Sequence, residues 1–260
     1  MASSDKAAEA RAKAKANMKA QERRTTMMIV SGIVVALVVF GGLVFFIMNQ
    51  NKGLDQLGDA ATGSPAGSLA NGAIPVGSSG TAGVTDDNPP VTVDVYYDYM
   101  CPYCQAFEQI NSSDLDQLRQ AGTIQVNYHP IAILDGASNG TKYSTRAANA
   151  AATVADADPT HFLDFTVALF ANQPSEGSDG LSDDDLAALA VSVGVPADVA
   201  KTFADYKFRS WVTSATEQSS VDGVSGTPTV MVNGEALDPN TVNYFTEGTL
   251  AAYLTQVAGQ

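Results

Sequence analysis

The feature that most constrains this chain is a pair of cysteines at positions 101 and 104, in the motif CPYC, with no other cysteine among 260 residues. The preceding residues 91–97 (VTVDVYY) are β-branched and aromatic, which is typical of a strand. Apolar residues at helical spacing follow the motif as far as Gly122 and predict a helix. Residues 123–128 predict a second strand. The order strand, CxxC, helix, strand predicts a βαβ unit with parallel strands.

The spacing of the two cysteines suits redox chemistry. Residues i and i+3 share one face of a helix, so two thiols there can form a disulfide of about 2.05 Å without backbone strain. Cys101 would lie at the helix N-terminus, where free N–H groups and the helix dipole favour a thiolate and lower its pKa. Pro102 fits the first helical position. We predict Cys101 as the exposed nucleophile and Cys104 as the buried resolving thiol, exchanging through a mixed disulfide.

Two other interpretations of the motif stay open. A zinc site needs about four ligands, and CxxC supplies two. His129 and His161 are the remaining candidates, but nothing in the sequence brings them near. A purely structural disulfide closing so short a loop would remove little unfolded-state entropy. We expect no metal and no cofactor other than the redox-active Cys101–Cys104 disulfide.

The second half of the chain changes character. Residues 142–220 are rich in alanine and predict an all-helical insertion, with helices near 142–157, 160–171, 182–193 and 196–218. Residues 229–232 (TVMV) then predict a short buried strand, and Asn233-Gly234 suits a two-residue hairpin turn. A C-terminal helix follows, with apolar residues at helical spacing at Leu250, Tyr253, Leu254 and Val257.

A second motif, Gly-Thr-Pro-Thr at residues 226–229, stands directly before this strand. Proline at such a place starts a strand or forms a turn. From the residues alone, the Thr227–Pro228 bond is either an ordinary trans bond or a cis bond kept for a purpose.

Together these features resemble the DsbA-like branch of the thioredoxin superfamily over about residues 85–260. The resemblance implies an α/β thioredoxin-like fold with the helical insertion at about 142–220. It implies that Pro228 is cis beside the CxxC motif, and that the Thr227 backbone pairs with bound substrate as an added strand. Cys101 and Cys104 are then the catalytic pair.

The chain departs from the family at two places. The residues between the cysteines, Pro102 and Tyr103, tune the redox potential, and the best-known strong oxidant has Pro-His there. The family often has a buried acid six residues before the nucleophile, where this chain has Val95. Asp94 is one position away, and strand alternation points it to the other face. Asp98 is the nearer candidate for proton handling, with a loop or capping role as the alternative.

The N-terminal region predicts a membrane anchor. Residues 27–48 are 22 uncharged residues, about 33 Å as a helix and enough to cross a bilayer core. We expect an uncleaved signal anchor, because a cleavable signal peptide has a shorter apolar core. Residues 1–26 carry a net charge of +4, so the positive-inside rule puts this tail in the cytoplasm and the catalytic domain outside. Residues 49–90, rich in Gly, Ser and Ala, predict a disordered linker, with residues 91–260 as the thioredoxin-like domain.

These features predict a single-pass cell-membrane enzyme that introduces disulfides into extracytoplasmic proteins. By resemblance, a quinone-linked membrane partner of the DsbB or VKOR kind re-oxidises it. A reductase or isomerase of the same fold is the alternative, and a non-redox binding or holdase module is a further one. Residues 27–260 carry a net charge of −18, which argues against binding nucleic acid, because phosphate repels an acidic surface.

Overall fold

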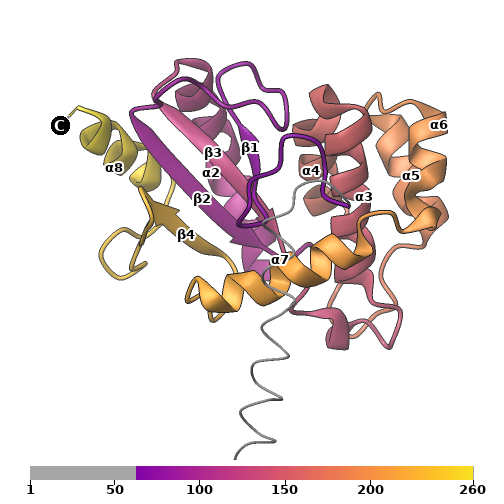
Figure 1. Ribbon diagram of the computed structural model, residues 1–260. Coiled ribbons are helices and arrows are strands. Elements are labelled where there is room, and N and C mark those ends of the chain that lie inside the picture. The colour runs from indigo at the N-terminus through magenta and orange to yellow at the C-terminus, as the bar shows by residue number, and fades with distance from the viewer. Residues whose placement is uncertain (1–62, 260) are drawn as a thin grey trace, which may run out of the picture. The chain divides into compact units, whose positions relative to one another are not determined.

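A five-stranded sheet runs through the part of the chain that the computed structural model describes, residues 63–259 (Figure 1). Its order is β1-β3-β2-β4-β5, with bounds Ile74–Val76, Ile124–Pro130, Val91–Tyr97, Thr229–Val232 and Glu235–Ala236. Strands β2 and β3 are parallel, and the other neighbours are antiparallel. The predicted βαβ unit and the strand that follows the second motif are therefore confirmed.

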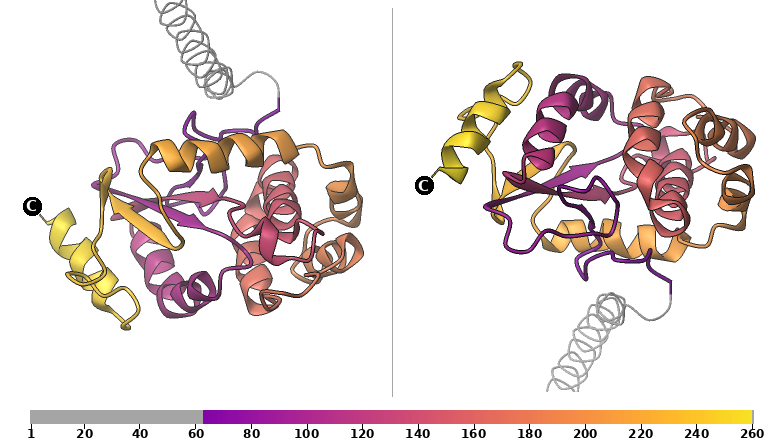
Figure 2. Two further views of the ribbon diagram at one scale, coloured as in Figure 1. Left: turned by 90° about the horizontal axis from the view of Figure 1, so that it is seen from below. Right: turned by 90° about the horizontal axis from the view of Figure 1, so that it is seen from above.

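Helices cover both faces of this sheet (Figure 2). Helices α2 (Pro102–Gln120) and α8 (Thr249–Ala258) lie on one face, and α7 (Arg209–Val221) lies on the other. The alternation of β2 matches this arrangement. Val93 and Val95 point into the main core, whereas Tyr96 packs in a smaller cluster with Ile131 and Met231.

The predicted helical insertion is confirmed. It contains α3 (Tyr143–Ala157), α4 (Phe162–Ala171), α5 (Asp183–Ser192) and α6 (Ala197–Ala200), and continues into α7. Short 3-10 turns occupy Asp135–Ala137, Pro159–His161 and Lys201–Asp205. These helices gather at one end of the sheet (Figure 2).

One long helix over residues 196–218 was expected, and this is wrong. Tyr206 adopts a left-handed conformation, with φ of 51°, and separates α6 and its 3-10 continuation from α7. Its hydroxyl is held by a hydrogen bond to Asp183 at the start of α5. A tertiary contact therefore favours a break that helical periodicity does not reveal.

The predicted linker over residues 49–90 is wrong for residues 63–90. Residues 63–90 fold onto the domain, and β1 pairs antiparallel with the edge of β3. Ile74 and Val76 are fully buried. Glycine makes the close backbone contact of this segment possible, because a Cβ on Gly67 would lie 2.3 Å from the Gly83 carbonyl oxygen. A three-residue strand added to an existing sheet edge needs no long hydrophobic run, so composition does not predict it.

The predicted basic tail, membrane span and first part of the linker, residues 1–26, 27–48 and 49–62, lie outside the described residues. Within residues 63–259 no helix combines the length and the apolar character that a bilayer crossing requires.

Candidate active site

Cys101 lies at the junction of β2 and α2, as the sequence predicts. It is the N-cap of α2, with φ of −78° and ψ of 116°, and Pro102 occupies the first turn. The Cys101 carbonyl accepts hydrogen bonds from the backbone N–H groups of Cys104 (3.0 Å) and Gln105 (3.2 Å). Both cysteines are free thiols. The extended backbone at Cys101 thus leaves its side chain before the free N–H groups of the helix.

The second motif contacts this thiol directly. The Thr227–Pro228 peptide bond is cis, as the resemblance implies. The Cys101 Sγ lies 3.2 Å from the Thr227 carbonyl oxygen, across 126 residues of sequence. Thr227 and Pro228 are half-buried.

Hydrogen bonds make Cys101 acidic. A bond from the Cys104 thiol is the largest cause that lowers its pKa, to about 6, and burial opposes it. The Thr227 side chain and the backbone N–H groups at the start of α2 lower this pKa further. Cys101 is therefore largely a thiolate at neutral pH, which is the reactive form.

Cys104 has the opposite character. It is 1 % exposed, and burial followed by the neighbouring Cys101 raises its pKa well above the ordinary value. The acidic Cys101 thiol and the buried, protonated Cys104 thiol differ in the way that the predicted roles of nucleophile and resolving thiol require. Cys101 is itself only 5 % exposed, however, so the prediction that it is an exposed thiol is wrong.

Asp98 is fully buried between β2 and the motif. Its carboxylate accepts hydrogen bonds from the Met100 N–H (2.8 Å), the Leu134 N–H (2.9 Å) and the Ser144 hydroxyl (2.7 Å). Desolvation nevertheless raises its pKa to about 6. These bonds tie the loop before Cys101 to α3, which supports the alternative that Asp98 holds the loop. Proton handling by Asp98 stays a prediction.

Two glutamines that the sequence did not single out fasten the motif to the helical insertion. The Gln173 side chain, just after α4, donates to the carbonyls of Tyr99 and Cys101, both at 3.0 Å. Gln105 donates to the Phe170 carbonyl at 2.7 Å. Gln173 follows the motif by about 70 residues with no pattern that links them, so only the folded chain reveals this contact.

The surface beside the motif is aromatic. Tyr103 is 67 % exposed, and its ring meets Phe245 edge to face at 6.2 Å between centroids. The Tyr244 hydroxyl lies 3.5 Å from the Pro228 carbonyl oxygen. That Pro102 and Tyr103 tune the potential stays a prediction.

Val95 and Asp94 lie as strand alternation predicts. Val95 is buried beside Cys104 and lines a cavity with it. Asp94 lies on the other face, where its carboxylate is 2.9 Å from the His129 Nε2. His129 also stacks on Tyr96 at 3.9 Å between centroids. His161 pairs with Asp158 at 2.7 Å. Both imidazoles thus serve local structure.

Comparisons with known proteins agree with this geometry. Residues 81–247 match the family described as Thioredoxin. The thiol–disulfide oxidoreductase MdbA of Actinomyces oris superposes with a TM-score of 0.62 at 26% identity, over 76% of this chain and 91% of that one. Oxidised DsbA of Mycobacterium tuberculosis superposes with a TM-score of 0.59 at 32% identity, over 72% and 93%.

A curated relative shares a part of this domain. Serine/threonine-protein kinase PknE of Mycobacterium tuberculosis is 35% identical over 149 residues, which is 54% of this chain and 26% of the kinase. This chain thus spans about a quarter of the length of the curated relatives it matches. Taken with the CxxC motif at a helix start, the cis proline beside it and the matched residues, these likenesses show that the chain belongs to the thioredoxin family and is a DsbA-like thiol–disulfide oxidoreductase.

Proposed function

We propose that this enzyme introduces disulfide bonds into proteins outside the cytoplasm, with Cys101 as nucleophile and Cys104 as resolving thiol. The observation that carries the proposal is the acidic Cys101 thiol at the start of α2, beside Thr227 and the cis Pro228. A substrate thiolate attacks Cys101, and the Cys101–Cys104 bond breaks to give a mixed disulfide. A second substrate thiolate then attacks the substrate sulfur, and Cys101 leaves as a thiolate. The substrate loses two electrons and two protons, and the enzyme becomes a dithiol.

The acidity of Cys101 favours this direction. A low pKa stabilises the Cys101 thiolate, which is part of the reduced enzyme. Stabilising the reduced enzyme makes its disulfide more oxidising. A shift of the pKa from 9.0 to about 6 stabilises the reduced enzyme at pH 7 by about 1.4 kcal/mol, or about 30 mV for two electrons. This is one contribution among several, because thioredoxin and the strong oxidant DsbA differ by about 150 mV.

Substrate capture uses the backbone at Thr227. An extended substrate segment that pairs there would bring its cysteine to Cys101, and main-chain hydrogen bonds of this kind do not depend on sequence. The exposed ring of Tyr103 within the CxxC motif offers apolar contact of equally low selectivity. Both features suit an enzyme that acts on many unfolded chains.

The proposed location rests on residues 27–48, which would anchor the protein with the catalytic domain on the outer side of the cell membrane. A thiol oxidant in that compartment must be re-oxidised. A quinone-linked membrane partner of the DsbB or VKOR kind is the proposed source of oxidising equivalents, and an anchor would keep the two enzymes in one membrane.

The test is an equilibrium titration of the full-length protein with glutathione redox buffers. The proposal expects a potential near the value of about −120 mV of DsbA, and catalysed formation of disulfides in a reduced, unfolded protein. A potential near about −270 mV, with catalysed reduction of a disulfide substrate, would contradict it and identify a reductase.

A second experiment tests the location. Intact cells are treated with a membrane-impermeant maleimide after mild reduction. Labelling of Cys101 in intact cells supports an outward-facing domain, whereas labelling only after lysis would place the domain in the cytoplasm.

A further inference from the structure

The loop that carries the cis proline is held at both ends by one residue of the sheet. Residues 222–228 form this loop, between α7 and β4. The backbone of Tyr96 pairs with that of Thr229, the first residue of β4. The Tyr96 hydroxyl donates a hydrogen bond of 3.0 Å to the carboxylate of Asp222, the first residue of the loop. Tyr96 therefore fixes both the start of the loop and its entry into the sheet.

The ring of Tyr96 is itself held in one orientation. It is buried and stacks on the imidazole of His129, with 3.9 Å between the ring centroids. The Nε2 of His129 lies 2.9 Å from the Asp94 carboxylate, which also accepts a hydrogen bond from the Asn127 side chain at 3.0 Å. Burial, followed by the charge of Asp222, raises the pKa of Tyr96. Its hydroxyl thus stays protonated and remains a donor to Asp222.

The first half of the loop is bound to α7. The second carboxylate oxygen of Asp222 accepts a hydrogen bond of 2.8 Å from the Gln218 side chain. The Val224 N–H donates to the Ser219 carbonyl at 2.9 Å, and the Val224 side chain packs against the small cluster that contains Tyr96. Asp222 is therefore the residue through which the end of α7 and the sheet are joined.

The second half of the loop reaches the catalytic thiol. The Thr229 hydroxyl donates to the Gly226 carbonyl at 2.7 Å, and the Thr227 carbonyl oxygen lies 3.2 Å from the Cys101 Sγ. Residues 225–227 are exposed or half-buried. Because little packing holds these three residues, their position relative to Cys101 depends on how firmly the two ends of the loop are held.

We propose that Tyr96 is a positioning residue for substrate capture, because its hydrogen bond to Asp222 holds the Thr227 backbone where an extended substrate pairs beside Cys101. The inference rests on the proposed pairing of substrate at Thr227. Tyr96 acts through the loop and not by contact with the reacting sulfur atoms. Its effect is therefore expected with polypeptide thiols, which must pair with the loop, and not with small thiols.

The test compares two dithiols as reductants of the oxidised full-length enzyme. One is a short unstructured peptide with two cysteines, and the other is dithiothreitol. The reaction at pH 7 is quenched with acid, and the enzyme dithiol is quantified by mass spectrometry. Rising peptide concentrations give the half-saturating concentration and the maximal rate separately. Both dithiols attack the same Cys101 sulfur, so a change in the disulfide itself would affect both.

Tyr96→Phe removes only the hydroxyl. The loop should then occupy its binding position for a smaller fraction of the time, which raises the half-saturating peptide concentration roughly three- to tenfold. The maximal rate with peptide and the rate constant with dithiothreitol should stay within about twofold of wild type, because the chemistry at Cys101 is unchanged. An unchanged half-saturating concentration, or an equal loss of rate with dithiothreitol, would overturn the inference.

Variants of Asp222 test whether the two side chains act together. Asp222→Leu removes the acceptor and should match Tyr96→Phe. Asp222→Asn keeps an acceptor oxygen and should bind the peptide nearly as wild type does. Combining Tyr96→Phe with Asp222→Leu should be no worse than either change alone, because both remove the same interaction. Additive effects would show that the hydrogen bond is not the cause and would overturn the inference.

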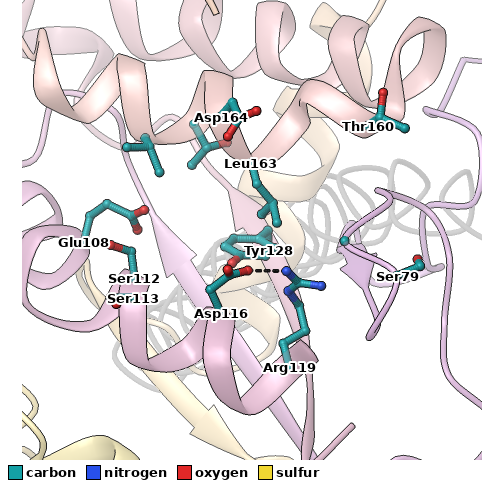
Figure 3. A pocket seen from close by; sticks show the side chains of 13 residues that line it. Ser79, Glu108, Ser112, Ser113, Asp116, Arg119, Tyr128, Thr160, Leu163 and Asp164 are labelled. Carbon is teal, nitrogen blue, oxygen red and sulfur yellow. Dashed lines mark hydrogen bonds and ion pairs between the residues drawn. The ribbon is translucent and has the colours of Figure 1, made fainter. Parts of the chain in front are cut away.

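Tyr128→Phe is the matched control. It makes the same change on the neighbouring strand β3, but Tyr128 packs against the main core and lines a cleft between α2 and α4, as Figure 3 shows. This variant should react with both dithiols as wild type does. A loss of peptide affinity equal to that of Tyr96→Phe would mean that any lost hydroxyl in the sheet has this effect, and would overturn the inference.

Failure of the proposed function would look different, because the wild-type enzyme itself would then not oxidise the peptide. A second measurement needs no substrate. Hydrogen exchange of the Val224 amide, which is bonded to the Ser219 carbonyl, is measured by NMR in the full-length wild type and in Tyr96→Phe. The inference expects exchange to become roughly three- to tenfold faster in the variant. Equal exchange rates would show that Tyr96 does not hold the loop.

Discussion

At the scale of single residues, short-range hydrogen bonds outweigh the charge of the whole protein. The chain carries a net charge of −14, which by itself would raise the pKa of a thiol. The pKa of Cys101 is nevertheless lowered to about 6. Charges beyond about 8–10 Å are largely screened by physiological salt, whereas the bonds to Cys101 are direct. The reactivity of the thiol is therefore set by its immediate contacts.

Thr227→Val tests one of these contacts. The valine keeps the shape of the side chain and removes the hydroxyl, whose hydrogen bond lowers the pKa of Cys101. A hydrogen bond to a charged group contributes about 1.5–3 kcal/mol, so the pKa should rise by roughly 1–2 units. Thiolate absorbance near 240 nm against pH measures it. Thr227→Ser keeps the hydroxyl and should titrate as wild type, and an unchanged Thr227→Val titration would show that the hydroxyl does not stabilise the thiolate.

Asp98→Asn tests the buried carboxylate. Burial raises the pKa of Asp98 from 3.8 to about 6, so between these values the folded protein binds more protons than the unfolded chain. The free energy of unfolding of the wild type therefore falls as pH rises through this window, by about 2–3 kcal/mol, and asparagine has no such dependence. Urea unfolding at pH 4 and pH 7 should show the wild type losing that much relative to the variant. A constant difference would mean that the pKa of Asp98 is not raised.

At the scale of elements, strand β1 is part of the domain although the sequence on either side of it is poor in large apolar residues. Ile74→Ala should lower the free energy of unfolding by about 2–5 kcal/mol, because Ile74 is fully buried against the sheet. Val84 belongs to the same segment but is 43 % exposed, so Val84→Ala should change stability by no more than about 0.5 kcal/mol. Denaturant unfolding of the full-length variants measures both. Equal, small effects would mean that β1 contributes little to the fold.

Sequence patterns predicted those elements that are determined by residues close together in the chain. The β-branched and aromatic residues at 91–97 predicted β2, and Asn233-Gly234 predicted the hairpin turn, in which both residues have positive φ. The linker boundary and the break at Tyr206 were missed, because a neighbouring element decides them.

The residues of the candidate site also fall into those that sequence motifs predict and those that only the fold reveals. Both cysteines and Pro228 belong to motifs that sequence alone reveals. Gln173 reaches Cys101, and Ser144 reaches Asp98 in the loop before it, only through folding of the helical insertion.

At the scale of the whole molecule, the helical insertion and the sheet meet at the CxxC motif. Gln173 donates to two carbonyls of the loop that carries Cys101, and each such bond contributes about 1 kcal/mol. The insertion thus supports the site as well as covering the sheet.

Gln173→Leu should loosen this connection. Hydrogen exchange of the amides at residues 99–104 should become roughly 10–30-fold faster, because two hydrogen bonds to the loop are lost. Asn172→Ala is the matched control, since the Asn172 side chain donates to the Ala168 carbonyl of its own helix. Mass spectrometry of peptides from both variants measures the exchange. Similar rates in the two variants would show that the insertion does not hold the loop.

The way the sheet ends at β1 bears on the proposal that the enzyme acts on unfolded chains. Pro75, the middle residue of β1, has no N–H, and its carbonyl already accepts a hydrogen bond from Gly83. An edge strand with unpaired N–H and C=O groups would pair with unfolded polypeptides or with other copies of the protein. This edge of the sheet is therefore protected against edge-to-edge association, and an extended substrate of the proposed kind would pair beside Cys101 instead.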